Sequence, residues 1–137
     1  MKTIQKNREP SEWIERRNTP GTIYEAIPQL RQSLIEEQGY ICAYCMQRIE
    51  TDKSKIEHIK CQERYPNQQL DYNNLVICCY GNSNEKHCDN SKGKQDVSFN
   101  LFDQDLEKSI SYKTKDGKIT SCNTNWDREL NEVLNLN

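Results

Sequence analysis

The 137-residue chain has room for one modest domain, and its apolar content of 34% predicts a thin hydrophobic core. The net charge is −2, and the lysines and arginines are scattered rather than gathered in the basic patch typical of a protein that binds nucleic acid unaided, so action on DNA or RNA would draw part of its positive charge from a partner. No apolar run reaches membrane-spanning length and the first residues carry no hydrophobic leader, which predicts a cytoplasmic protein without membrane contact. In that reducing compartment, seven cysteines indicate a metal site rather than disulfides, and a structural metal would stabilise the thin core.

The N-terminal part is expected to hold one helix. Residues 1–21 are polar and end in a Pro-Gly turn. Apolar side chains then recur at steps of four, three and four residues, at Ile23, Ile27, Leu30 and Leu34. This period predicts an amphipathic helix over residues 22–38. Pro28 either kinks this helix or begins its main segment, and Gly39 ends it.

The middle of the chain is expected to form two short strands and a short helix. Residues 55–59 carry β-branched side chains on both sides of a Glu-His pair, and residues 75–78 form a second apolar run. A short helix is expected to begin near Lys86 or Cys88. These elements predict an α+β fold.

The C-terminal part is expected to add a hairpin and a helix. Two alternating runs, residues 109–112 and 118–120, flank an Asp-Gly pair, which is a typical hairpin turn. Residues 125–136 then show a helical period, with an apolar face formed by Trp126, Leu130, Val133 and Leu134.

The cysteine spacing predicts a zinc site. Cys42 and Cys45 form a C-x-x-C knuckle, and Cys88 is a distant third ligand. The fourth ligand is Cys78 or Cys79, and the spacing alone does not choose between them. Because neighbouring strand residues point to opposite faces, only one of the two can reach the metal. Four thiolates leave zinc no open position, so this site would be structural.

Residues 38–93 also carry a set of motifs that resembles the zinc-framed HNH endonucleases. The matching pieces are CAYC at 42–45, IEHI at 56–59, NNL at 73–75 and HCDNSKG at 87–93. The stretches LRQSLIEEQGYICAYC and ELNEVLNLN further resemble the HNH subunit of Septu-type anti-phage defence and its retron-associated relatives. This resemblance covers most of the chain.

The resemblance implies a zinc-framed ββα-metal core at residues 38–96 of a single domain spanning 1–137, with a helical lead-in at 1–37 and a hairpin and helix at 97–137. In the family the second cysteine pair begins five residues after the asparagine. Asn74 therefore selects Cys79, with Cys88, Cys42 and Cys45, and leaves Cys78 facing the core. His87 is then expected beside the zinc or at the surface rather than as a ligand.

The same resemblance implies the chemistry. Glu57 and Asp89 would bind catalytic Mg²⁺ or Mn²⁺, His58 would be the general base, and Asn74 would brace His58 and its loop. Asn90 is the alternative to Asp89 as a ligand, but Asp89 keeps the family's three-residue step to Lys92. Three basic residues are candidates for phosphate contacts and equally for ordinary solvated charges: Lys60, Arg64 and Lys92.

The implied function is hydrolysis of phosphodiester bonds, with phage DNA as the expected substrate and an ATPase subunit of a Septu-like complex as the partner. The helix at residues 22–38 or the one at 125–136 is expected to dock on that subunit. RNA, such as tRNA, is an alternative substrate, and a non-catalytic zinc docking module is a further alternative. Relatives continue beyond the position of Asn137, so the sequence fits either a truncated or a naturally short form.

Overall fold

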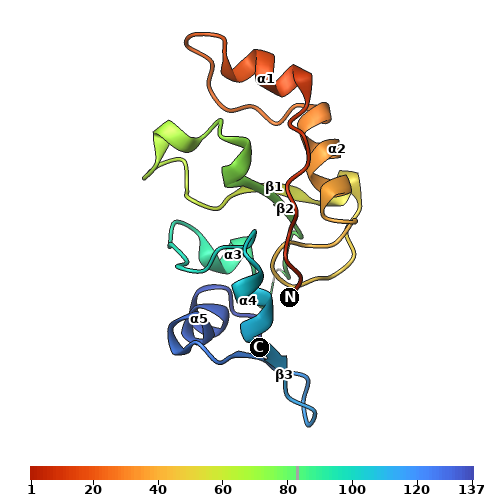
Figure 1. The fold of residues 1–137 in the computed structure, drawn as a ribbon, viewed down its shortest axis with the longest axis vertical. Coiled ribbons are helices and arrows are strands. Elements are labelled where there is room, and N and C mark those ends of the chain that lie inside the picture. The colour runs from red at the N-terminus through yellow and green to blue at the C-terminus, as the bar shows by residue number, and fades with distance from the viewer. Residues whose placement is uncertain (83) are drawn as a thin grey trace.

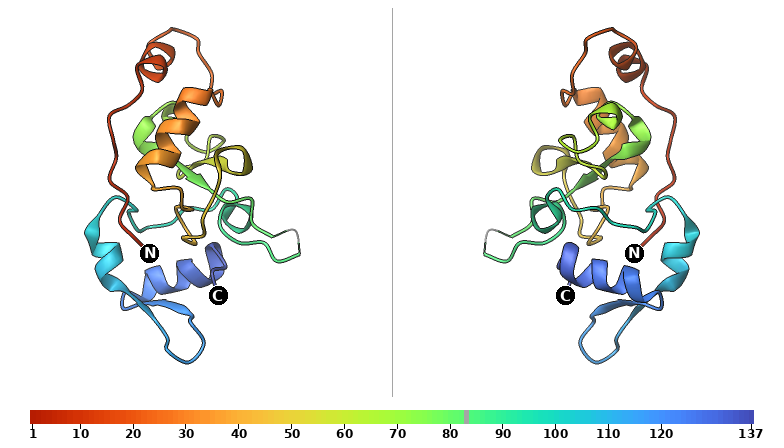
Figure 2. Two further views of the ribbon diagram at one scale, coloured as in Figure 1. Left: turned by 90° about the vertical axis from the view of Figure 1, so that its right-hand side faces the viewer. Right: turned by 90° about the vertical axis from the view of Figure 1, so that its left-hand side faces the viewer.

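The computed structural model describes residues 1–82 and 84–137, which form helices and two small antiparallel sheets, as expected for an α+β fold (Figure 1). The helix α1 lies at one end of the long axis and the hairpin of β3 lies at the other (Figure 1). The N-terminus lies near the C-terminal elements, and the first segment of the chain runs from there along the molecule to α1 (Figure 2). There Ile4 donates a backbone hydrogen bond of 3.0 Å to Leu101.

The N-terminal part holds two helices, of which only one was expected. The helix α1 spans Ser11–Arg17, and its Trp13 is fully buried, with the indole N–H donating to the Leu70 carbonyl at 3.0 Å. The helix α1 was not predicted, because it has one buried apolar side chain rather than an apolar stripe.

The helix α2 spans Pro28–Glu37. Pro28 begins the helix, as one of the two expectations had it, because the missing proline N–H costs nothing in a first turn. The expectation that the helix starts at residue 22 is wrong, and Ile23 is 72% exposed. The buried stripe of α2 consists of Leu30, Leu34 and Ile35.

The central sheet pairs β1, Lys55–His58, with β2, Leu75–Cys78, as predicted. The antiparallel register sets Glu57 opposite Val76 and His58 opposite Leu75. The short helix α3, Asp89–Lys92, begins directly after Cys88.

The C-terminal part contains α4, Gln104–Ser109, then the predicted hairpin of β3, Ile110–Tyr112, with β4, Ile119–Ser121. The expected last helix is present as α5, Thr124–Arg128, continued by a π-helical turn at Glu129–Val133. The helix α4 was not predicted from the sequence.

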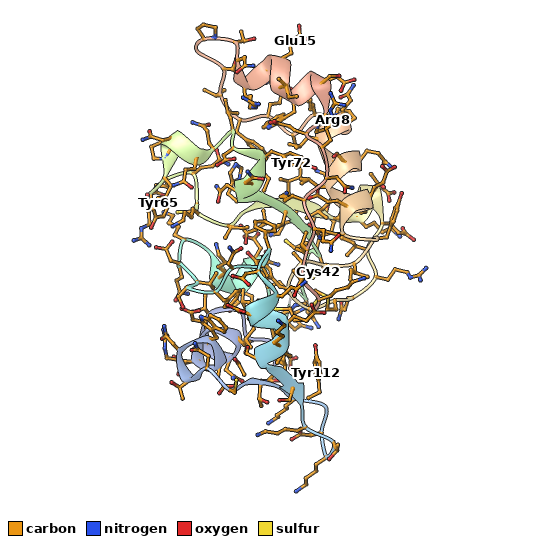
Figure 3. All side chains as sticks on the ribbon, viewed as in Figure 1. Arg8, Glu15, Cys42, Tyr65, Tyr72 and Tyr112 are labelled. Carbon is orange, nitrogen blue, oxygen red and sulfur yellow. The ribbon has the colours of Figure 1, made fainter. Side chains whose placement is uncertain are left out.

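One apolar cluster runs through these elements, from Met1 and Trp13 to Leu130 and Leu134. Figure 3 shows the labelled Tyr72 near the middle of the molecule and Cys42 nearer the C-terminal elements. Among the described residues, none of the helices combines the length and the apolar character that crossing a bilayer requires.

Candidate functional site

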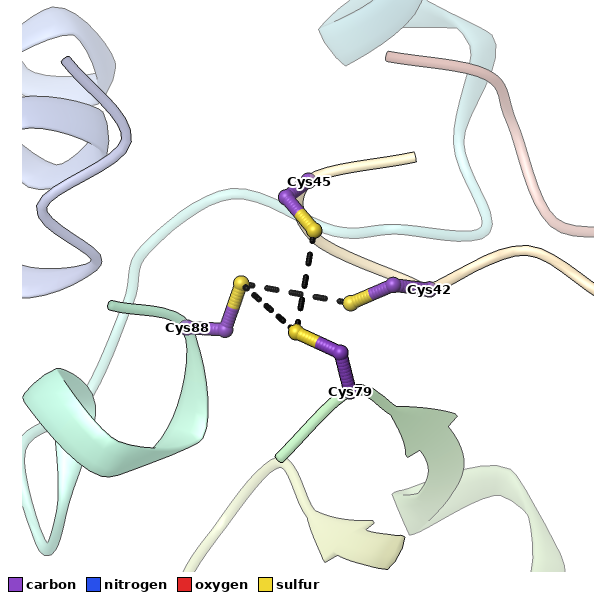
Figure 4. A group of neighbouring side chains, drawn as sticks. All are labelled: Cys42, Cys45, Cys79 and Cys88. Atoms are coloured by element: carbon purple, nitrogen blue, oxygen red, sulfur yellow. Dashed lines mark hydrogen bonds between the residues drawn. The ribbon is translucent and has the colours of Figure 1, made fainter. Parts of the chain in front are cut away.

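Four cysteines from three separate segments meet at one point (Figure 4). The Sγ atoms of Cys42, Cys45, Cys79 and Cys88 all lie within 4.8 Å of one another. Three of the separations are 3.7 Å for Cys45–Cys79, 3.8 Å for Cys79–Cys88 and 3.9 Å for Cys42–Cys88. Zinc–sulfur bonds of about 2.3 Å in a tetrahedron place the sulfurs about 3.8 Å apart. The four residues are therefore spaced to hold a zinc ion.

The backbone near these cysteines forms a hydrogen-bonded turn and contains residues with positive φ angles. Cys42 N–H donates to the Gln47 carbonyl at 2.8 Å and Met46 N–H donates to Cys42 at 3.2 Å, which closes the knuckle. Met46 and Cys88 have positive φ angles of 63° and 56°, in the left-handed region that side chains other than glycine rarely adopt. Such strain persists where the surroundings fix the backbone, as a bound metal would.

The structure also selects between the two candidates for the fourth ligand. Cys79 joins the cluster, whereas Cys78 is fully buried in β2 and lies outside it. Burial raises the pKa of the Cys78 thiol well above its usual range, which keeps it protonated. Cys79 thus lies in the cluster and Cys78 in the core, where the resemblance had placed them.

His87 lies beside the cluster and is not one of the four grouped residues. Its Nδ1 is 3.2 Å from the Cys88 sulfur, within reach of an N–H···S hydrogen bond. The backbone N–H of Cys88 donates to the Leu134 carbonyl at 2.8 Å, so the C-terminal turn holds this cysteine in place.

Glu57 is buried, with 5% of its surface exposed, and is linked to the cysteine knuckle through Tyr44. Tyr44, which sits between the two cysteines of the knuckle, donates its hydroxyl to Glu57 Oε2 at 3.2 Å. Lys92 Nζ lies 3.7 Å from the same oxygen. Burial raises the pKa of Glu57 to about 8, with the Lys92 charge opposing and the nearby Asp89 carboxylate adding to the rise.

Asp89, at the start of α3, forms an ion pair with Lys55 of β1. Lys55 also donates to Asn90 Oδ1 at 2.6 Å, and Asn90 in turn donates to the Tyr80 carbonyl. The Asn90 side chain is therefore engaged with the Tyr80 backbone. The Asp89 charge adds to the rise in the pKa of Glu57, which burial causes, and opposes the fall in the pKa of His58, which burial also causes. Of the two candidate ligands on α3, Asp89 is the one that acts on the Glu-His pair.

His58 is buried on the opposite face of β1 from Glu57, as strand geometry requires. Its Nε2 lies 3.0 Å from the Gln69 carbonyl, and the Gln62 amide approaches Nδ1 at 3.4 Å. A carbonyl can only accept, so Nε2 carries the proton and Nδ1 is the free base of the neutral ring. Burial lowers the pKa of His58, an effect that the Gln69 carbonyl and the Asp89 charge oppose.

A tyrosine covers this histidine. The ring of Tyr24 meets the His58 ring edge-on, with centroids 4.4 Å apart. The Tyr24 backbone is held there by a 3.1 Å hydrogen bond to the Gln69 side chain.

Asn74 directly precedes β2, and its side chain forms hydrogen bonds with the backbone of the loop that follows β1. Its side chain accepts from Lys60 N–H at 2.8 Å and donates to the Lys60 and Gln68 carbonyls at 3.0 and 3.2 Å. These bonds fix the backbone two residues after His58.

Both alternatives given for Lys92, a phosphate contact and a solvated charge, are wrong, because its side chain is fully buried against Glu57. Lys60 and Arg64 remain at the surface, where each lies over the Tyr65 ring, at 4.8 and 5.7 Å from its centroid. Sequence reasoning also missed the contacts made by Tyr24, Tyr44 and Lys55. For Lys55 a signal existed, because it stands two residues before Glu57 and so shares its strand face.

The carboxylate pair fits a hard divalent ion. Mg²⁺ and Mn²⁺ prefer oxygen ligands, and Mg²⁺ commonly binds through one or two carboxylates while keeping several waters. Glu57 and Asp89 supply such a pair. Among the described residues, the Lys92 ammonium has no hydrogen-bond partner, so its ion pair with Glu57 at 3.7 Å offsets the cost of burying its charge.

No protein-family model matches the chain, and no curated protein is significantly similar to it.

Proposed function

We propose that the chain is a metal-dependent HNH endonuclease with a structural zinc site. The observation that supports this most strongly is the chain order of β1, β2 and α3 around the cysteine cluster, with Glu57, His58 and Asp89 on these elements. A docking module held by zinc would need the cysteines but not this set of acid and base groups.

In this proposal each residue has a distinct role. Glu57 and Asp89 bind the divalent ion, and His58 accepts a proton at Nδ1 from the attacking water. The Gln69 carbonyl fixes the His58 tautomer, and the Asn74 side chain holds the backbone of the loop that follows His58. The bound Mg²⁺ or Mn²⁺ would supply charge stabilisation at the phosphate and the departing 3′ oxygen.

The proposed substrate is phage DNA, and the proposed partner is the ATPase subunit of a Septu-like complex. Support comes from the resemblance of the motifs and from the net charge of −2, which favours a partner that contributes positive charge. The apolar faces of α2 and of the last helix are buried within the chain, at Leu30, Leu34, Leu130 and Leu134. Docking would therefore use their polar faces.

A second candidate, a non-catalytic zinc module, has one observation in its favour. His58 is only 6% exposed and lies under Tyr24, so a substrate phosphate reaches it only if the Tyr24 segment moves.

The test is cleavage of DNA and RNA duplexes and single strands by the zinc-loaded chain, alone and with its ATPase neighbour, in Mg²⁺ or Mn²⁺. His58→Ala should lower the rate by about 10²- to 10⁴-fold while zinc content and thermal unfolding stay unchanged. Asp89→Ala should stop cleavage and Asn90→Ala should not, since the two variants differ in which side chain is lost from the same turn. Wild-type cleavage of RNA but not DNA would move the substrate to RNA. A folded His58→Ala protein that cuts at the wild-type rate, or no cleavage in any complex, would favour the zinc module.

A further inference from the structure

Each of the two proposed ligand carboxylates is already paired with a lysine of the same chain. Lys92 Nζ lies 3.7 Å from Glu57, and Lys55 forms the ion pair with Asp89. Two carboxyl groups thus face two ammonium groups. The inference drawn from this pairing rests on the proposed divalent-ion site.

The two lysines differ in their freedom to move. The Lys92 side chain is fully buried, so its ammonium cannot leave Glu57 without opening the core. The side chains of Lys55 and Asp89 are 28% and 23% exposed, so Lys55 can swing into solvent and have its lost contacts replaced by water.

The anchoring of Lys55 is also local. Its ammonium bonds to two neighbouring residues at the start of α3, Asp89 and Asn90, the latter at 2.6 Å. It shares the β1 face with Glu57, two residues on, so it reaches the carboxylate pair from the strand side. The Lys55 ammonium therefore occupies the charge position that a cation between β1 and α3 would take.

A divalent cation held by the two carboxyl groups would lie close to both ammonium groups, and like charges a few ångströms apart repel. Of the two lysines, the partly exposed Lys55 is the one that can move away from its carboxylate. We propose that the Lys55 ammonium is an internal competitor for the divalent cation: it holds Asp89 in the metal-free chain and leaves it when Mg²⁺ or Mn²⁺ binds. Lys55 then sets the cation concentration at which the site fills.

The test is the dissociation constant of Mn²⁺ for the zinc-loaded chain, measured from the electron paramagnetic resonance signal of free Mn²⁺. Lys55→Met should tighten Mn²⁺ binding on the order of tenfold, because the ion no longer has to displace an ammonium group from Asp89. Lys55→Arg retains the charge and should bind no more tightly than wild type. Lys53→Met is the matched control, since this lysine is 74% exposed and pairs with Glu50 instead. It should leave the constant unchanged.

The outcomes separate this inference from the proposed function. Unchanged or weaker Mn²⁺ binding in a folded, zinc-loaded Lys55→Met protein overturns the role of Lys55 and leaves the divalent-ion site intact. An equal gain in Lys53→Met also overturns it, because the effect is then one of net charge. Binding that is detectable only in Lys55→Met supports the competitor role in its strongest form. No Mn²⁺ binding in any variant removes both the competitor role and the divalent-ion site.

Discussion

The cysteine cluster and the carboxylate pair are neighbours, but they are built in opposite ways. The four sulfurs face one another and would fill the coordination sphere of zinc completely. Glu57 and Asp89 instead face lysines, and each depends on residues outside the pair for its charge balance. The cysteine cluster is therefore complete in its own ligands, whereas the proposed divalent-ion site depends on ion pairs with other residues, of which the partly exposed Lys55–Asp89 pair can be exchanged.

The two regions are physically joined. Tyr44 lies between two of the clustered cysteines and bonds to Glu57, and Asp89 directly follows Cys88. Loss of the cysteine cluster should therefore disturb the carboxylates, while loss of a carboxylate should leave the cysteines in place.

The largest effect that tests this asymmetry is expected from the cysteine cluster. Cys79→Ala should release zinc and unfold the chain, because structural zinc contributes on the order of 10–16 kcal/mol to the folding of small zinc-finger peptides. Cys78→Ala is the matched control and should keep the zinc, since it removes only a small buried side chain. Zinc content and circular dichroism distinguish the two. Equal zinc loss from both variants would contradict the assignment.

The next largest effect is expected from the buried ion pair. Lys92→Met should lower the free energy of unfolding by about 3–5 kcal/mol above pH 8, where Glu57 is ionised and its carboxylate loses its buried partner, and by less at lower pH. Adding Glu57→Gln should restore part of that loss, and a double-mutant cycle by chemical denaturation measures the coupling. Additive losses would show that Lys92 acts through packing alone. Both variants should retain zinc if the asymmetry holds.

A smaller effect is expected where the C-terminal turn supports the cysteine cluster. Asn135 donates to the Lys86 carbonyl at 2.7 Å and has a positive φ of 51°. Asn135→Ala should cost about 1–2 kcal/mol of unfolding free energy, through the lost hydrogen bond and the backbone strain. Asn135→Gly removes the bond but tolerates the backbone angle, so it should cost less. Equal costs measured by thermal unfolding would assign the whole effect to the hydrogen bond.

The smallest effect concerns the cover over His58. Burial lowers the pKa of this histidine, so Tyr24→Ala should raise it towards its ordinary value of about 6.5. Because the folded-state pKa is the depressed one, the wild-type ring stays neutral to a lower pH than in the variant. Proton NMR titration of the two histidines measures the shift, with Tyr40→Ala as a control at an exposed tyrosine. An unchanged His58 pKa in Tyr24→Ala would show that other residues bury the ring.

Much of this arrangement was predictable from the sequence because it depends on local patterns. The C-x-x-C knuckle, the strand pair and the Asp-Gly hairpin each follow from short-range rules, and the structure contains all three. The helices α1 and α4 were missed because neither displays a full apolar stripe. The contacts of Lys92 and Tyr24 were missed because burial of a lysine against one glutamate, or of a histidine under a distant tyrosine, is decided by tertiary packing.

In the proposed mechanism, zinc maintains the fold while a second, exchangeable divalent ion supports the chemistry. The test is the DNA-cleavage rate of the chain in complex with the proposed ATPase partner while Mg²⁺ is removed and restored, with zinc content and circular dichroism followed in the same samples. The prediction is that cleavage stops without Mg²⁺ and returns with it, while zinc content and fold stay constant. Cleavage that continues with zinc as the sole bound metal, or that is lost only together with zinc, would contradict the claim.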